Sequence, residues 1–132
     1  MTTTRRRLGA TLRADGRCRF EVWAPNAAHV EVLLTEQGDR PTPLEEQSEG
    51  YFVGAVDAVP PAARYRYRLH LRGGDVRERP DPASRSQPDG VHGPSGVVAE
   101  NFTWSETPWC GLPLTRYVIY ELHVGTFTPQ GT

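Results

Sequence analysis

The chain contains no lysine, and all 15 of its basic residues are arginine. Schiff-base catalysis and phosphate binding by a P-loop lysine are therefore excluded for this sequence. Cysteine is almost absent too: Cys18 and Cys110 are far apart and lack the spacing of a metal site. We expect both thiols to be reduced, buried and unreactive. The sequence indicates neither a metal ion nor a cofactor.

Long hydrophobic runs are also missing. No segment approaches the roughly 20 apolar residues of a membrane-spanning helix. The basic start, MTTTRRRLGATL, is not followed by the apolar core of about 7–15 residues that a signal peptide has. We therefore expect a cytoplasmic protein with no membrane partner, in which residues 1–8 form a disordered tail.

Charge of one sign is not in excess, because the net charge is −1. The charges are nevertheless segregated, with arginines before residue 20 and again at 64–79, and mostly acids between them. We expect these blocks to pair across strands and expect no nucleic-acid partner. The alternative is that Arg64, Arg66 and Arg68 bind phosphate or nucleic acid.

Alternating apolar and polar residues predict short strands. In RYRYRLHLR, residues 64–72, tyrosine and leucine alternate with arginine and histidine, which is the period of a half-buried strand. A Gly-Gly-Asp turn follows, and VRER is predicted to return as the second strand of a hairpin. The same pattern predicts strands in RCRFEVWAP, HVEVLL, YFVGAV and GVVAE, whereas GDRPTPLEEQSEG is interpreted as a connection.

Short strands at a spacing of about 10–15 residues predict an all-β fold, an Ig-like antiparallel β-sandwich over residues 9–100. Residues 101–116 would form a linker. Tyr117 to Val124 is nearly continuously apolar, as in a parallel strand covered on both faces. We expect residues 117–132 to begin a second domain that is truncated in this chain.

One long segment fits neither helix nor strand. RPDPASRSQPDGVHGPS, from Arg79 to Ser95, holds four prolines and two glycines in seventeen residues. Irregular loops beyond roughly 12–15 residues are uncommon inside a domain and are usually functional. We interpret this loop as a strap across a second domain, stiffened by proline so that docking costs less entropy.

Three motifs carry a resemblance to known enzymes. FEVWAPNAAHVEV resembles the start of the Ig-like N-terminal domain of α-amylase superfamily enzymes that act on branched or modified α-glucans. DPASRSQPDGVHGPS and VIYELHVGTFTPQGT are similar to the maltooligosyltrehalose trehalohydrolase family, glycoside hydrolases that release trehalose from the end of a maltooligosyl chain. One departure from the family pattern is Ser86, where an aromatic residue is expected.

The resemblance implies that VIYELHVG is the first strand of a (β/α)₈ catalytic barrel, and that the N-terminal domain packs on this barrel and shapes its cleft. The family's nucleophilic Asp and acid Glu belong to later strands, so no catalytic residue is assigned here. The chain alone is expected to be inactive and to meet α-glucan only through the full enzyme. The alternatives are an independent starch- or glycogen-binding module, and the same domain of a glycogen-branching or debranching enzyme.

Four residues are candidates for contact with carbohydrate: Trp23, His92, Trp104 and Trp109. Competing interpretations place Trp23 in the core, give His92 a loop-ordering hydrogen bond, and use Trp104 and Trp109 to pack the two domains together. The truncated strand also suggests self-association through Tyr117, Ile119 and Leu122, because an unpaired apolar strand recruits partners.

Overall fold

The computed structural model describes residues 7–99, 103 and 110–131 of the chain. The chain divides into two compact units, Met1–Asn101 and Phe102–Thr132. Most of the tail expected at 1–8 and much of the linker expected at 101–116 are outside the described residues.

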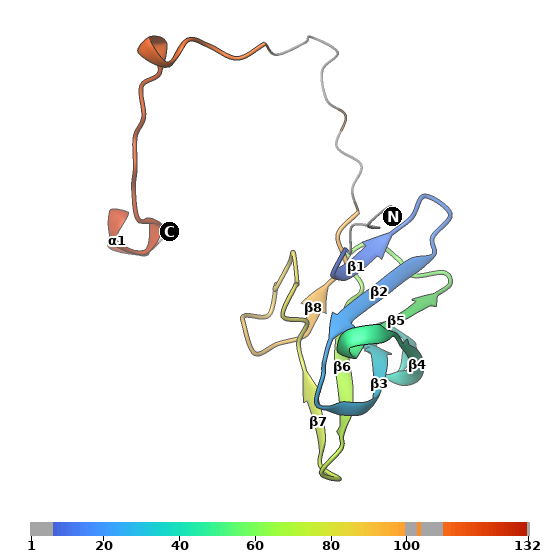
Figure 1. Ribbon diagram of the computed structural model, residues 1–132. Coiled ribbons are helices and arrows are strands. Elements are labelled where there is room, and N and C mark those ends of the chain that lie inside the picture. The colour runs from blue at the N-terminus through green and yellow to red at the C-terminus, as the bar shows by residue number, and fades with distance from the viewer. Residues whose placement is uncertain (1–6, 100–102, 104–109, 132) are drawn as a thin grey trace. The chain divides into compact units, whose positions relative to one another are not determined.

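The regular elements described in the first unit are mainly strands (Figure 1). They are β1 (Gly9–Leu12), β2 (Cys18–Trp23), β3 (Ala27–Leu34), β4 (Arg40–Glu46), β5 (Tyr51–Val56), β6 (Arg64–Leu71), β7 (Val76–Arg79) and β8 (Ser95–Gly96). Two short 3-10 turns, η1 (Thr35–Gln37) and η2 (Ser48–Gly50), flank β4. Every strand pairing among the described residues is antiparallel, in agreement with the predicted all-β architecture.

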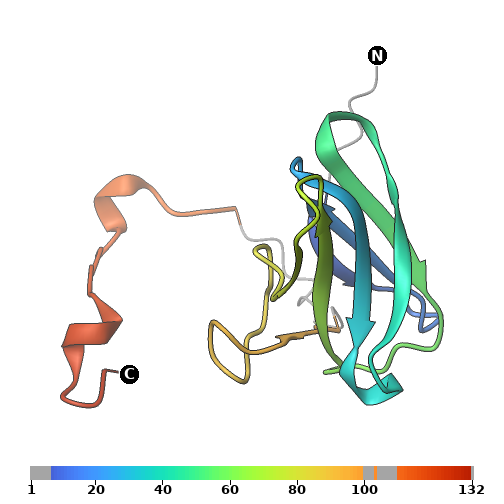
Figure 2. The same cartoon turned by 90° about the horizontal axis from the view of Figure 1, so that it is seen from below.

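The strands form a sandwich that is closed at one edge. Their order is β1-β2-β5-β4-β3-β6-β7, and β8 pairs with β6. Strand β4 passes between the layers, because Arg40–Leu44 pairs with β3 whereas Glu45 and Glu46 pair with β5. The rings of Phe20 on β2 and Tyr65 on β6 meet edge to face although these strands are not paired. The two halves of the path therefore face each other (Figure 2), and its ends, β1 and β7, leave the other edge open.

The core follows the predicted alternation. Cys18, Phe20 and Val22 of β2 are buried, as are Tyr65 and Tyr67 of β6. Aromatic rings and branched side chains at every second position fill the space between the two layers.

The cysteines differ from each other. Burial raises the pKa of the Cys18 thiol to about 11, so this thiol stays protonated and unreactive at neutral pH. The expectation that both cysteines are buried is wrong for Cys110, which is exposed.

Two strands were not predicted, β1 and β4. Strand β4 contains Pro41 and Pro43, which argue against a central strand. Strand β5 pairs only with Glu45 and Glu46 of β4, so one edge of residues 40–44 is not paired with any described strand. The two prolines are tolerated there, because the N–H groups that they lack would have no strand partner on that edge.

The hairpin of β6 and β7 forms as predicted, with Gly74 at a φ of 92° in the turn. The strand expected in GVVAE is shorter than predicted and ends at Gly96. Between β7 and β8, residues 80–94 form no helix or strand, in agreement with the sequence (yellow to orange in Figures 1 and 2).

The second unit, described at 103 and 110–131, contains η3 (Leu114–Arg116) and one helical turn, α1 (Val124–Phe127). The strand expected from Tyr117 to Val124 is not formed, because a strand exists only through hydrogen bonds to a neighbour and none of the described residues pairs with it. No helix in the described part is long and apolar enough to cross a bilayer.

Candidate functional site at the open edge of the sandwich

A groove of about 500 Å³ lies at the open edge of the sandwich, between the two layers and the loop after β7. Strand residues Val22, Tyr67 and Leu69 line it together with loop residues Pro80, Pro82 and Val91. These side chains make an apolar wall. A binding surface of this kind takes an apolar or aromatic-stacking partner.

Trp23 stands at the groove with 55% of its surface exposed. Its indole Nε1 donates a hydrogen bond to the carbonyl of Glu49, at 3.1 Å. The interpretation of Trp23 as a core residue is therefore wrong. The reason is the strand period itself, since Val22 faces the core and its neighbour must face outward.

Asp81 fixes the start of the loop. Its carboxylate is 1% exposed and accepts hydrogen bonds from the hydroxyls of Tyr65, at 2.6 Å, and Tyr67, at 3.3 Å. It also accepts the backbone N–H of Ala83, while the N–H of Asp81 donates to Ser95 Oγ. One buried residue thus ties the loop to the strands, through its carboxylate to Tyr65 and Tyr67 and through its backbone N–H to Ser95 at the start of β8.

The loop is fastened at further points. The Arg85 guanidinium donates to the carbonyl of Ala10 in β1, and the N–H of Gly96 donates to the carbonyl of Ser86. At Gly9, whose φ is 92°, a Cβ atom would lie 2.9 Å from the carbonyl oxygen of Ala83, so β1 and the loop approach closely only because glycine is there. The loop is therefore held on its own sandwich.

We expect the buried tyrosines to make the folded chain less stable at high pH. Burial, followed by the neighbouring Asp81 charge, raises the pKa of Tyr65 and of Tyr67 above the ordinary value of 10.0. Because the folded chain holds these protons more tightly than the unfolded chain, the stabilisation is complete below pH 10 and is lost as pH rises above it. We expect the unfolding free energy to fall by about 1.4 kcal/mol per pH unit for each phenol above pH 10.

Urea denaturation between pH 8 and 12 measures this slope, with absorbance of the phenolate as a second readout. The variant Tyr65→Phe should lose about 1.4 kcal/mol per pH unit of the slope above pH 10, the share of one phenol, whereas the Cys18 thiol, whose pKa is also raised, contributes to the slope of both proteins. A wild-type slope no steeper than that of this variant would contradict the assignment.

Of the other candidates, only His92 is among the described residues, and it does not line the groove beside Trp23. His92 is exposed on the loop and makes no hydrogen bond within the described residues, so the loop-ordering role expected for it is wrong. Asp81 and Arg85 perform that role instead. Trp104 and Trp109 are outside the described residues.

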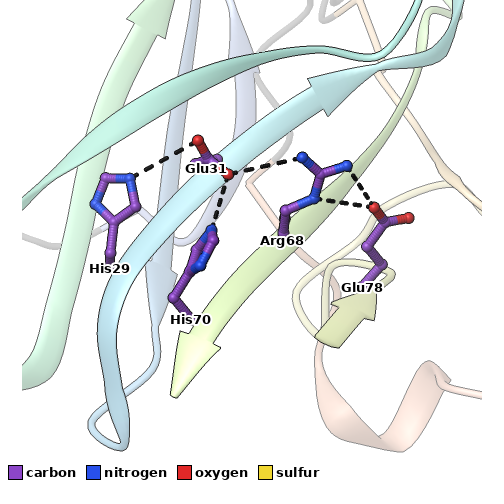
Figure 3. A network of polar contacts seen from close by, with 5 residues as sticks. All are labelled: His29, Glu31, Arg68, His70 and Glu78. Carbon is purple, nitrogen blue, oxygen red and sulfur yellow. Dashed lines mark hydrogen bonds and ion pairs between the residues drawn. The ribbon is translucent and has the colours of Figure 1, made fainter. Parts of the chain in front are cut away.

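The outer face of β3, β6 and β7 is covered by paired charges (Figure 3). Glu31 accepts from His70 at 3.0 Å and lies near His29 and Arg68. Arg68 pairs in turn with Glu78, at 2.8 Å. The pair of Arg68 with Glu31, like that of Arg72 with Glu46 at 3.1 Å, confirms the expected pairing of the acidic and basic blocks across strands, whereas Glu78 belongs to the basic block itself.

The remaining arginines of the stripe are also paired, Arg64 with Asp89 at 3.0 Å and Arg66 with Glu78 at 3.5 Å. With their carboxylate partners so close, these arginines form no patch of unbalanced positive charge for a phosphate backbone. Within the described residues, no group of three His, Cys, Asp or Glu side chains could hold a metal ion.

The comparison with protein families decides what kind of domain this is. The family model for carbohydrate-binding module 48 (isoamylase N-terminal domain) matches residues 7–84. The chain belongs to this family. The match contains all of the sandwich from β1 to β7 and ends inside the loop, so residues 85–94 of the loop and strand β8 are beyond it.

The similarity to individual proteins covers more of the chain than the family model does. A malto-oligosyltrehalose trehalohydrolase of Saccharolobus solfataricus is 40% identical over 124 residues, which are 94% of this chain and 21% of that protein. A 1,4-alpha-glucan branching enzyme of Deinococcus radiodurans is 30% identical over 83% of this chain and 17% of its own length. A solved structure from Salmonella typhimurium, a candidate alpha amylase by its name, superposes with a TM-score of 0.74 at 37% identity, over 95% of this chain and 20% of that one. The chain thus spans about a fifth of the length of these proteins.

The residues that organise this module's open edge are not among those predicted from the sequence. Asp81 was not singled out, although an aspartate between two prolines at the start of a loop is a typical Asx-turn position, in which the side chain accepts a backbone N–H two residues on. Its partners, Tyr65 and Tyr67, were assigned to the core by alternation alone, and nothing local in the sequence indicates that their hydroxyls share one carboxylate.

Proposed function

We propose that this carbohydrate-binding module 48 chain is the N-terminal domain of a glycoside hydrolase that releases trehalose from maltooligosyltrehalose by hydrolysing an α-1,4-glucosidic bond. The domain packs on the catalytic barrel of that enzyme and shapes its cleft. The observation that carries this proposal is the similarity to a named trehalohydrolase over 94% of the chain, a span that includes the whole loop after β7.

The geometry supports a packing role. The loop is fastened to its own sandwich by Asp81 and Arg85, so it presents a preformed surface. Little conformational entropy of the loop is lost when a partner binds to this surface. In the full enzyme, Tyr117–Val124 would become the first strand of the barrel, because the missing neighbours would then be supplied. We place this enzyme in the cytoplasm.

Activity measurements test the proposal. The 132-residue chain should release no trehalose from maltooligosyltrehalose, even at high protein concentration, because it carries no matched pair of catalytic carboxylates. The polypeptide encoded by the continuing open reading frame should release it. Trehalose produced by the short chain, or a stop codon directly after Thr132 in the native gene, would refute the proposal. A full polypeptide that instead branches or debranches glucan would show that the domain is right and the reaction wrong.

A second candidate function, an independent α-glucan-binding module, is favoured by one observation. The Trp23 ring is exposed and its edge is anchored, as in a platform for stacking on glucose. We expect isothermal titration of the 132-residue chain with maltoheptaose to show no binding tighter than millimolar. A Kd of about 100 µM or tighter that is lost in Trp23→Ala would favour the binding module over the packing role.

A further inference from the structure

The apolar surface at the open edge is larger than the groove alone. A second hollow of about 190 Å³ shares Val22, Trp23, Asp81 and Pro82 with it and extends the surface to Leu8, beside β1. Trp23 at 55% and Val91 at 67% exposure are the most prominent apolar side chains lining these hollows. A contiguous exposed apolar surface of this kind marks an interaction site rather than ordinary protein surface.

The polar groups lining the surface are largely engaged within the domain. The Asp81 carboxylate receives two tyrosine hydroxyls and one backbone N–H. The Ser84 hydroxyl donates to the carbonyl of Ser86. Recognition of a sugar requires several side chains that can bond its hydroxyls. Here the lining offers mainly Gln87 and Arg79, and the Arg79 guanidinium already donates to the carbonyl of Glu78. The surface is therefore better suited to an apolar protein partner than to a glucan chain.

The charged outer face of the sandwich is unsuited to such a partner. The outer face of β3, β6 and β7 carries the ion pairs formed by Glu31, Arg68 and Glu78 (Figure 3). A partner that docked on this face would have to desolvate these charges, which costs free energy. Among the described residues that line the open edge, Glu21 pairs with Arg19, at 2.6 Å, but there is no network like the one around Glu31 and Arg68.

We propose that the open edge of the sandwich, from Leu8 and Trp23 to Val91, is the surface on which the catalytic domain of the same polypeptide docks. This inference rests on the proposed function. The chain covers only 21% of the trehalohydrolase relative, so most of such a polypeptide is outside this chain and is covalently tethered to it. A tethered domain is present at high effective concentration, so a modest apolar surface suffices to hold it.

The test is a pair of matched substitutions in the polypeptide encoded by the continuing open reading frame. Val91→Glu places a charge in the proposed interface. Val76→Glu places the same charge on a valine that is 55% exposed in β7 and lines neither hollow. Both side chains are exposed, so both variants should keep the fold, and the melting temperature of each in the 132-residue chain checks this.

Limited digestion with trypsin reports whether the domains separate, through release of a fragment that ends at Arg116. Val91→Glu should accelerate this release about tenfold or more, because an unpaired charge must be desolvated for docking. Trp23→Ala should act in the same direction by removing an aromatic anchor. Val76→Glu should stay within about twofold of the wild type.

Equal rates for Val91→Glu and Val76→Glu would overturn the docking surface. So would glucan binding by the 132-residue chain that disappears in Trp23→Ala, since the groove would then hold carbohydrate. Failure of the proposed function is recognised separately. A wild-type polypeptide that releases no trehalose, but whose Val91→Glu variant is cut rapidly, retains the docking surface and loses only the reaction.

Discussion

Replacement of Asp81 by alanine is expected to lower the unfolding free energy of the 132-residue chain by about 3–5 kcal/mol. The substitution removes the acceptor shared by the hydroxyls of Tyr65 and Tyr67. Both tyrosines are about 1% exposed, so bulk water cannot replace this acceptor. It also frees the N–H of Ala83 and leaves a small cavity beside the two rings. Since typical domains are stable by only about 5–15 kcal/mol, this loss takes a large fraction of the total.

Urea denaturation at neutral pH measures the effect, and Asp89→Ala is the matched control. Asp89 is an exposed aspartate in the same loop whose pair with Arg64 is on the surface, so its removal should cost at most about 1 kcal/mol. Asp81→Asn keeps an acceptor oxygen and should recover part of the loss. A loss below about 1 kcal/mol in Asp81→Ala would show that the buried carboxylate does not hold the loop.

The strand period was sufficient to predict much of the sandwich. Phe20 and Val22 are buried because alternate side chains point to the same face, and the arginines of β6 meet acids because they share the outer face. The same period places Trp23 outside the core, against its interpretation as a core residue. Glycine at 74 marks its turn because the backbone there has a positive φ. Each of these features depends on residues that are close together in the sequence.

Features that depend on the arrangement of distant strands could not be predicted. Strand β4 breaks the local rules with Pro41 and Pro43, and only its position between two layers makes these prolines harmless. The contact of Arg85 with Ala10 joins a loop residue to the first strand, across most of the sandwich sequence. The groove arises in the same way, since it exists only where the two ends of the strand path leave the sandwich open.

The segment after η3 has the sequence pattern of a strand but no neighbouring strand to pair with among the described residues. Residues 117–124 have the composition of a strand covered on both faces, yet they are not paired with any of the described strands, and Ile119 is 82% exposed. A strand pattern specifies which side chains would be buried, but the neighbouring strand has to supply the hydrogen bonds.

We therefore expect the 132-residue chain to self-associate through Tyr117, Ile119 and Leu122. All three side chains are exposed, at 48%, 82% and 46%, and an unpaired apolar strand gains both hydrogen bonds and apolar contacts by pairing with a second copy. Light scattering should give at least twice the 14.7 kDa mass of one chain. A chain that ends at Leu114 should be monomeric.

Substitutions locate the interface more sharply than truncation does. Ile119→Asp combined with Leu122→Asp should give a monomer, because the charges would be desolvated on pairing. Val76→Asp, at an exposed valine of β7, should leave the associated state unchanged. If the unmodified chain is monomeric and its amides from Tyr117 to Val124 exchange rapidly, the segment has found no partner. Self-association would then be refuted. The proposal that these residues form the first strand of a barrel in the longer polypeptide would be unaffected. A neighbouring strand in the same polypeptide is at high effective concentration, so it pairs at a far lower intrinsic affinity than a separate chain needs.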